Sequence, residues 1–594
     1  MPALAATAAG VVPAIPAGAA SSPGVTAAAC TPGAHTLGLP GDHLYPDTGN
    51  GGYRSVHTDV TLVYDAPTDR FLDGTNVALS DRATQCLTSL SLDFEHTSPD
   101  AVDGPDLTVG SVTVDGRPAA FSFVQPTYPG DPHGQSDPDP AAHEASQTDP
   151  VGGPLDNPLP PACSPELTSS AGALRDAQDG AQCPADKLVI TPARKIRKGA
   201  TFTVVVDYTG RPGVHHDGDG TTEGWFRSSD GGFVTTEPVG TEDWMPLNDV
   251  PSAKPTYDFY DTVGAGLTAI ANGRLVSTIP GPATAEFPAG STTWHWNSSA
   301  PVASYLVEDS VGYYSLRQHT GPTGIVFYEA QDAAIPAAQQ QKNQAIMDDQ
   351  AAITDFERQF NGPYPFTSAG IVIGTPAASF EEEMQTMITF AGGSIATSVL
   401  YHENMHQWWG NNVTESGYEM TFYKEGLATL AQAFHAALLA EHAAGDTGTP
   451  AGSATFDASL VSQFDKRYAR GGAAWAGAPS DPTPYTLFSN SATYQRPMAA
   501  YLALRQILGD DRFTSALQEI QRDDGGGTID EAQLEAAFHR WMPDRSASCS
   551  TKLDAFFTQW FDTAYPTANG AAKPQITGPG LDGPGFYAVG GGCG

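Results

Sequence analysis

Apolar and polar residues alternate along much of the first half of the chain. Within residues 53–311, the segments HTDVTLVYD, LTSLSLDF, KLVITPAR and TFTVVVDY each predict a strand. The pairs Asp115-Gly116 and Asn272-Gly273 each separate two apolar segments, which predicts a hairpin turn at both places. The N-terminal half is therefore expected to consist of β-sheets.

The pattern changes after Gly324. GIVFYEA and AGIVIG predict strands, and residues 337–360 between them predict a helix. Helical patterns follow near the C-terminus, at residues 494–508, 512–520, 529–541 and 553–563. A strand, a helix, a second strand and then several helices predict an α+β domain.

Two histidines lie four residues apart in the segment YHENMHQWWGNNVT. His402 and His406 continue a helical apolar pattern through Val399 and Trp409, so both imidazoles are expected on one face of a helix. Such a pair can bind one metal ion. Ser394 or Thr397 would cap the start of this helix, and Gly410 with Asn411 would end it.

A second helical pattern begins near Tyr423 and carries Glu425, nineteen positions after His406. Zinc accepts two imidazoles and usually takes a third protein ligand, which leaves a fourth position for water. We therefore expect one Zn²⁺ per chain, bound by His402, His406 and Glu425. Glu403 follows the first histidine and points off the ligand face, where it can serve as a general base.

The composition excludes several classes of partner. The 594 residues are too many for one core and predict several domains. A formal charge of −38, from 29 Lys+Arg against 67 Asp+Glu, argues against nucleic acid or an anionic membrane. The acidic surface would serve solubility, with a preference for cationic peptides as the alternative. No run approaches the roughly 18 apolar residues that a membrane-spanning helix needs.

The N-terminus and the cysteines indicate a secreted protein. Residues 1–29 are Ala-rich and uncharged, and Ala17-Gly18-Ala19 resembles a signal-peptidase site, although the basic start of a signal peptide is missing. The alternative is a disordered leader. Six cysteines allow about 15 disulfide connectivities. Short loops favour Cys163 with Cys183 and Cys549 with Cys593, which leaves Cys30 for Cys86.

Three segments predict loops. Residues 125–186 are rich in Pro, Asp and Gly and predict a surface insertion, and the Gly-rich residues 567–594 predict a loosely held tail. HHDGDGTTEG, which begins at His215, is similar to a calcium loop but lacks its final glutamate and its helices. It is interpreted as an acidic loop with His215 and His216 exposed.

These motifs together resemble the zinc aminopeptidases related to aminopeptidase N, within the gluzincin group. The family pattern HExxHxWxGNxVT is matched by His402, Glu403, His406, Trp408, Gly410, Asn411, Val413 and Thr414, and Glu425 has the family's spacing for the third ligand. The resemblance implies an α+β multidomain fold, with a β-rich, saddle-like N-terminal domain at 30–316. A thermolysin-like catalytic domain with a helical C-terminal part is expected at 317–566.

The resemblance also implies further site residues. TTEPVGTEDWMPLNDVPSAKPTY is similar to a family segment that places Glu237 at the substrate's free amine. FEEEMQTM occupies the position of the family's exopeptidase motif and places Glu383 at the same amine. ATYQRPMAAYLALR places Tyr494 as the tyrosine that stabilises the transition state.

Several residues depart from the family pattern and leave the substrate preference open. Glu381 and Glu382 replace a small residue and a methionine, Pro497 replaces a glycine, and Lys424 replaces the asparagine before the third ligand. Tryptophans are replaced by Tyr418 and Phe422.

The predicted function is stepwise release of N-terminal amino acids from peptides with a free N-terminus. The alternatives are a zinc endopeptidase with the same chemistry and a catalytically silent peptide-binding protein. The preferred N-terminal residue and the oligomeric state are not predicted.

Overall fold

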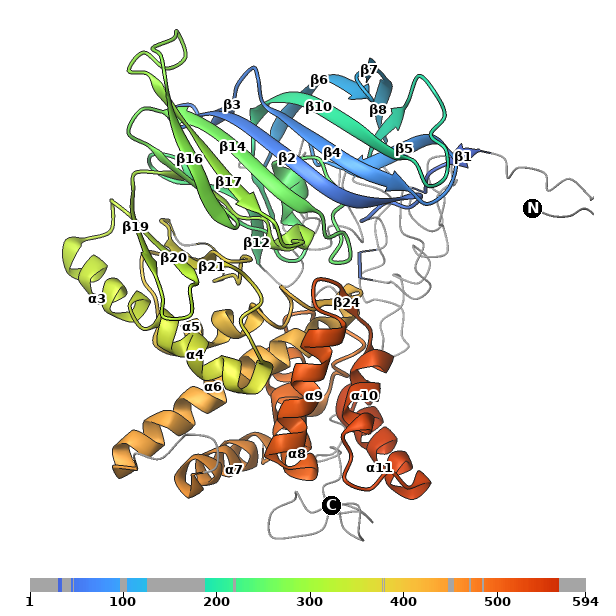
Figure 1. Ribbon diagram of the computed structural model, residues 1–594, viewed down its shortest axis with the longest axis vertical. Coiled ribbons are helices and arrows are strands. Elements are labelled where there is room, and N and C mark those ends of the chain that lie inside the picture. Colours follow the sequence, from blue (N-terminus) through green and yellow to red (C-terminus); the bar gives the residue numbers. More distant parts are fainter. Residues whose placement is uncertain are drawn as a thin grey trace, which may run out of the picture.

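The computed structural model describes residues 30–34, 44–45, 48–96, 104–124, 187–216, 221–376, 378, 380–446, 453–469, 472–482 and 486–565. Sheets of the N-terminal part lie above a helical C-terminal part in Figure 1. The predicted order of a β-rich part followed by an α+β part is confirmed. The predicted leader, the insertion and the tail lie outside the described residues.

The largest sheet has the order β16-β17-β14-β2-β3-β10-β6-β7, and β4 pairs with both β10 and β2. Its strands are β2 (Tyr53–Asp65), β3 (Arg70–Phe71), β4 (Asn76–Ala83), β6 (Asp106–Val114), β7 (Arg117–Pro118), β10 (Thr201–Arg211), β14 (Thr256–Gly264), β16 (Arg274–Gly281) and β17 (Ser291–Ser298). Buried residues alternate with more exposed ones along β2, β10 and β14, so one face packs on a core and the other faces outward.

Two smaller sheets complete the N-terminal part. One has the order β1-β5-β9-β8, and the other has the order β11-β12-β13-β18-β15. The first contains β1 (Thr31–Pro32), β5 (Leu87–Asp93), β8 (Ala120–Val124) and β9 (Lys187–Thr191). The second contains β11 (Val214–His216), β12 (Thr222–Arg227), β13 (Gly232–Thr235), β15 (Thr268–Ala271) and β18 (Asp309–Gly312).

The predicted disulfide between Cys30 and Cys86 is confirmed, and it joins the residues that precede β1 and β5. Cys549 is also disulfide-bonded. Its predicted partner Cys593 lies outside the described residues, as do Cys163 and Cys183.

Of the two predicted hairpins, one is confirmed and one is wrong. Asp115 and Gly116 both have positive φ, 51° and 68°, and join the paired strands β6 and β7. Asn272 and Gly273 instead connect two strands of different sheets, β15 and β16. The reason is a set of contacts with residues distant in the sequence. Asn272 Nδ2 donates hydrogen bonds to the carbonyls of Leu306 and Gln385, and these bonds hold the turn at a junction of sheets.

The C-terminal part has a sheet of order β19-β20-β21-β22 followed by helices. Its strands are β19 (Tyr314–Thr320), β20 (Val326–Asp332), β21 (Ser368–Ile373) and β22 (Ile388–Phe390), and a small sheet pairs β23 (Thr414–Glu415) with β24 (Thr528–Ile529). The helices are α3 (Ala337–Met347), α4 (Gln350–Asn361), α5 (Thr397–His406), α6 (Thr421–Ala444), α7 (Ala454–Tyr468), α8 (Arg496–Leu508), α9 (Asp510–Asp523), α10 (Glu531–Arg540) and α11 (Ala547–Phe557). The single helix predicted for 337–360 is therefore two helices, α3 and α4.

The helices α5, α6 and α8 form the centre of the C-terminal core. On the apolar stripe of α6, Leu427, Leu430 and Phe434 are fully buried, and Leu438 is partly buried. Gly426 allows α6 to approach α8, because a Cβ at this position would lie 2.5 Å from Pro497 Cβ. None of the described helices combines the length and apolar character needed to cross a membrane.

Candidate metal centre

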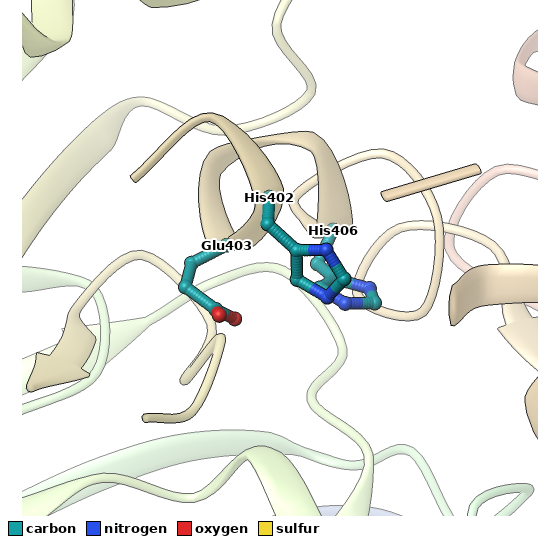
Figure 2. A group of neighbouring side chains, drawn as sticks. All are labelled: His402, Glu403 and His406. Carbon is teal, nitrogen blue, oxygen red and sulfur yellow. The ribbon is translucent and has the colours of Figure 1, made fainter. Parts of the chain in front are cut away.

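The two histidines of the motif lie one turn apart on α5, and Figure 2 shows their rings close together with the Glu403 carboxylate to one side of them. The predicted helix is confirmed, although it begins after Ala396 without a side-chain cap, so neither Ser394 nor Thr397 caps it. The ring centroids of His402 and His406 are 4.9 Å apart. Both rings are nearly inaccessible to solvent.

Glu425 on α6 brings its carboxylate to both imidazoles. The Glu425 Oε2 lies 3.1 Å from His402 Nε2 and 3.5 Å from His406 Nε2. His406 Nδ1 lies 2.9 Å from the carbonyl of Trp409, which accepts its proton and leaves Nε2 as a lone-pair donor.

This donor set fits zinc. Two imidazole nitrogens and one carboxylate oxygen are ligands that zinc takes in catalytic sites, and ligand atoms of a tetrahedral zinc site lie about 3.3 Å apart. The separations of 3.1 and 3.5 Å are close to that value. The structure therefore brings together the three predicted ligands His402, His406 and Glu425 in a geometry that can hold the ion.

Lys424 contacts three carboxylates of the centre. Its Nζ lies 2.5 Å from Glu237, 2.6 Å from Glu383 and 2.9 Å from Glu425 Oε1, and the whole side chain is buried. Burial would lower the pKa of Lys424, but the carboxylates of Glu237, Glu383 and Glu425 raise it well above its ordinary value. Burial likewise acts to raise the pKa of Glu425, and Lys424 outweighs it, so that the pKa lies well below its ordinary value.

Glu237 and Glu383, which the resemblance predicted, therefore both contact the ammonium group of Lys424. Glu383 Oε1 also lies 3.7 Å from His406 Nδ1. The backbone of Glu383 is fixed because its carbonyl accepts hydrogen bonds from Gln407 Nε2 at 2.9 Å and Asn411 Nδ2 at 2.7 Å. The Asn411 of the motif therefore helps to place Glu383.

The three consecutive glutamates separate into different environments. Glu382 points away from the centre and accepts a hydrogen bond from the backbone N–H of Thr236 at 2.6 Å. This contact fixes the residue before Glu237. Glu381 is exposed at the pocket, so Glu383 is the member of the triplet that reaches Lys424.

The segment after β13 is also supported by His215, whose predicted exposure is wrong. His215 is buried, with Nδ1 2.6 Å from Asp243 Oδ2 and Nε2 3.8 Å from Glu223 Oε2. Glu223 in turn accepts the backbone N–H of Val239 at 3.1 Å. The strand pairing of β11 with β12 turns this histidine inward, which a loop interpretation could not predict.

A pocket of about 280 Å³ opens over these residues. It is lined by Glu237, Glu383, His402, Glu403, Glu425 and Tyr494, among others. One oxygen of Glu403 lies within 4.8 Å of a ring nitrogen of each histidine. Burial raises the pKa of Glu403 well above its ordinary value, and the carboxylates of Glu383 and Glu425 add to this rise.

Tyr494 lies across the pocket in a π-helical turn, Asn490–Gln495, that precedes α8. Its ring centroid is 6.0 Å from that of His402. Burial raises the pKa of Tyr494 well above its ordinary value, and the charge of Glu425 contributes, so the phenol keeps its proton. All the predicted site residues therefore line one pocket.

Two residues that support the centre were not predicted to do so. Lys254, from the N-terminal part, donates from Nζ to the carbonyls of Asn411 and Asn412 and to Thr414 Oγ1, which fixes the loop after α5. Gly410 has a φ of +109°, and a Cβ there would lie 3.0 Å from Lys424 Cδ. The prediction that Gly410 and Asn411 end the helix is wrong, because α5 ends at His406; Gly410 instead makes room for Lys424.

Comparison with known proteins gives the family of this domain. Residues 345–560 match the model of the peptidase family M1 domain. Leucine aminopeptidase 2 of Aspergillus niger is 25% identical over 203 residues, which cover 33% of this chain and 31% of the relative. Aminopeptidase B of Rattus norvegicus is 26% identical over 195 residues, covering 32% of this chain and 27% of the relative. The match thus spans about a third or less of the length of these curated relatives.

Solved structures share the fold over most of the chain. A two-domain M1 zinc metallopeptidase mutant bound to L-arginine has a TM-score of 0.65 at 20% identity and covers 90% of this chain and 99% of its own. An M1 zinc metallopeptidase mutant of Deinococcus radiodurans, bound to a Tyr-Ser-Ala substrate, has a TM-score of 0.64 at 20% identity and covers 89% and 98%. The resemblance predicted from the motifs is confirmed: residues 345–560 match the peptidase family M1 domain, and the fold is similar to that of two-domain M1 zinc metallopeptidases.

Proposed function

We propose that this chain is a zinc-dependent aminopeptidase that hydrolyses the N-terminal bond of peptides. The observation that carries this proposal is the convergence of His402, His406 and Glu425 in a pocket that also holds Glu403. The names of the relatives, leucine aminopeptidase 2 and aminopeptidase B, support the same activity.

In the proposed mechanism His402, His406 and Glu425 hold the zinc ion. When it is bound, zinc supplies Lewis acidity, which makes water more acidic and polarises the scissile carbonyl. Glu403 takes a proton from the attacking water and returns it to the nitrogen of the leaving group. Burial raises the pKa of Glu403, which makes its carboxylate a stronger base toward the attacking water.

Tyr494 is the proposed hydrogen-bond donor to the transition state. The phenol remains protonated because burial raises its pKa. It can therefore donate to the carbonyl oxygen as negative charge develops there, an interaction that is stronger in the transition state than in the bound substrate.

Glu237 and Glu383 are the proposed binding groups for the substrate's N-terminal ammonium. Charge-assisted hydrogen bonds to two carboxylates would hold the amine at one end of the pocket, so that the first peptide bond lies at the metal ligands. Lys424 supplies one ammonium group to the two glutamates, and burial raises the pKa of Glu237 well above its ordinary value, an effect that the positive charge of an incoming amine would oppose. A solved structural neighbour with a bound Tyr-Ser-Ala substrate supports a peptide as the ligand.

The alternative function is that of an endopeptidase, and Lys424 is the observation that favours it. An ammonium group already lies within 2.6 Å of both glutamates, where an aminopeptidase would place the amine of its substrate. If Lys424 satisfied both carboxylates, a free N-terminus would gain nothing from them.

One assay separates these functions. A panel of aminoacyl-arylamides would be hydrolysed with and without a chelator, together with a peptide and its N-acetylated twin. We expect hydrolysis that the chelator abolishes, and cleavage of the free-amine peptide only. Equal cleavage of the two peptides would support the endopeptidase, and bound zinc without any turnover would support a silent binding protein.

Export of the chain is part of the proposal. The disulfide between Cys30 and Cys86 supports it, because disulfides persist in oxidising compartments. Secretion into the medium by the natural host, detected with an antibody, would test it.

A further inference from the structure

A second cluster of histidine and aspartate side chains lies on the large N-terminal sheet. His57 and Asp59 are on β2, Asp258 is on the adjacent β14, and His295 is on β17 next to it. In the register, Asp258 is directly opposite Asp59 on one side and Asn297 on the other. Residues two apart on a strand share a face, so these side chains gather on the partly exposed face of the sheet.

Three of these side chains bring one possible ligand atom each close together. His57 Nε2 lies 3.5 Å from Asp59 Oδ1 and 3.7 Å from Asp258 Oδ2, and the ligand atoms of all three residues lie within 4.8 Å of one another. The first two separations are longer than ordinary hydrogen bonds. They are close to the about 3.3 Å that separates ligand atoms around a tetrahedral zinc ion.

Hydrogen bonds on the far side of His57 direct its lone pair toward these carboxylates. His57 Nδ1 lies 2.8 Å from Thr256 Oγ1, and that hydroxyl lies 3.5 Å from the carbonyl of Val56, to which it can donate. The hydroxyl oxygen can then accept a hydrogen bond from His57 Nδ1–H, and in that tautomer Nε2 carries the lone pair that faces the carboxylates. Histidines that bind metals are oriented in this way by a partner of the other ring nitrogen.

Asp258 is oriented in a comparable way. His295 Nε2 lies 2.6 Å from Asp258 Oδ1 and donates to it, and Asn297 Nδ2 donates to Asp258 Oδ2 at 3.0 Å. Within the described part of the chain, no lysine or arginine forms an ion pair with Asp59 or Asp258. Two carboxylates therefore lie close together in a chain of charge −38 without a fixed cation.

We propose that His57, Asp59 and Asp258 form a second site for a divalent transition-metal ion of the zinc class. The imidazole favours such an ion over calcium or magnesium, which prefer ligand sets made of oxygen atoms alone. Three protein ligands with water at the remaining position bind the ion less tightly than a buried centre does. The bound ion connects β2 to β14, so it stabilises the N-terminal sheet and takes no part in peptide hydrolysis.

The experiment measures zinc bound per chain in the full-length protein. The protein is stripped of metal and then titrated with Zn²⁺ by equilibrium dialysis, with zinc determined by mass spectrometry. We expect two zinc ions per wild-type chain, one bound more weakly than the other. Asp258→Asn, which keeps the shape of the side chain and removes its charge, should lose the weaker ion and keep the peptidase activity.

The matched control is Asp65→Asn, which removes the same charge from the neighbouring strand β2, on the face of Asp59 but at the far end of that strand. This variant should bind two zinc ions. His57→Ala provides a second variant. Both the wild type and this variant are first loaded with zinc at the tight site. Further Zn²⁺ should then raise the melting temperature of the wild type and leave the melting temperature of His57→Ala unchanged. One zinc per wild-type chain, or two in both Asp258→Asn and His57→Ala, would overturn the proposal and leave His57 as a partner in ordinary surface ion pairs.

Discussion

Two groups of histidine and carboxylate side chains in this chain have similar ligands and different surroundings. In the centre between α5 and α6, His406 is 1% exposed and Glu425 is 2% exposed. On the strands β2 and β14, the side chains of His57, Asp59 and Asp258 are between 20% and 43% exposed.

The two groups differ in how the negative charges of their carboxylates are compensated. In the buried centre Lys424 lies against three carboxylates, because charges removed from water need partners within the protein. On the strands, water reaches the carboxylates, so register and a few hydrogen bonds suffice to bring the side chains together. Burial gives the first centre a dry pocket in which electrostatic interactions are strong, and exposure gives the second a weaker and purely structural site.

The largest effect is expected from Glu403→Gln. This variant keeps the shape of the side chain and removes the proposed base, so kcat should fall by about 10²–10⁴-fold or more while the zinc content stays the same. The control is Glu357→Gln, which changes another buried carboxylate that contacts α5 through Asn404 outside the pocket. Hydrolysis of arylamides by Glu403→Gln at the wild-type rate would show that the base is a different residue.

Tyr494→Phe is expected to have the next largest effect. Loss of the phenol removes a donor to the developing oxyanion, so kcat should fall by about 10²–10³-fold with little change in KM. Tyr423→Phe is the control, because its hydroxyl contacts the carbonyl of Val413 and does not line the pocket. A fall in kcat that is equal in the two variants would mean that Tyr494 acts through packing.

Lys424→Met should weaken zinc binding by about 10–100-fold, as loss of a group that orients a metal ligand typically does. The reason is that Glu425 Oε1 loses its partner while Oε2 must still face both imidazoles. Competition with a chelator of known affinity would measure the zinc affinity of the variant. Lys187→Met, which changes a buried lysine of β9 that pairs with Asp93 away from the centre, should keep the zinc affinity. An unchanged affinity in Lys424→Met would mean that α6 alone positions Glu425.

The smallest effect on activity is expected when a chelator added in steps removes only the first of the two zinc ions. Because the strand site is exposed and has fewer surrounding contacts, its ion should leave first, and arylamide hydrolysis should persist until the second ion is removed. Zinc content and rate would be followed in the same samples. A rate that falls in proportion to the first ion released would contradict the assignment of the two sites.

Local periodicity explains what the sequence predicted. The i and i+4 spacing of His402 and His406 and the apolar stripe of α6 are visible within one helix, and so the candidate ligands could be predicted without the fold. The alternation in β2 and β10 and the turn at Asp115-Gly116 are equally local signals. These features were confirmed.

Contacts between distant segments account for what was missed. The turn at Asn272-Gly273 has the residues of a hairpin, but the hydrogen bonds of Asn272 to Leu306 and Gln385 decide its partners. The burial of His215 depends on Asp243, and the role of Lys424 depends on Glu237 from the N-terminal part of the chain. Lys424 was noted only as a departure from a family pattern, because a single sequence does not show which charges meet in the core.

The most direct test of the central claim is an anomalous difference map recorded from crystals at the zinc absorption edge. We predict a strong peak bounded by the Nε2 atoms of His402 and His406 and the Oε2 of Glu425, and a weaker peak at His57. No peak between α5 and α6 in crystals of an active preparation would contradict it.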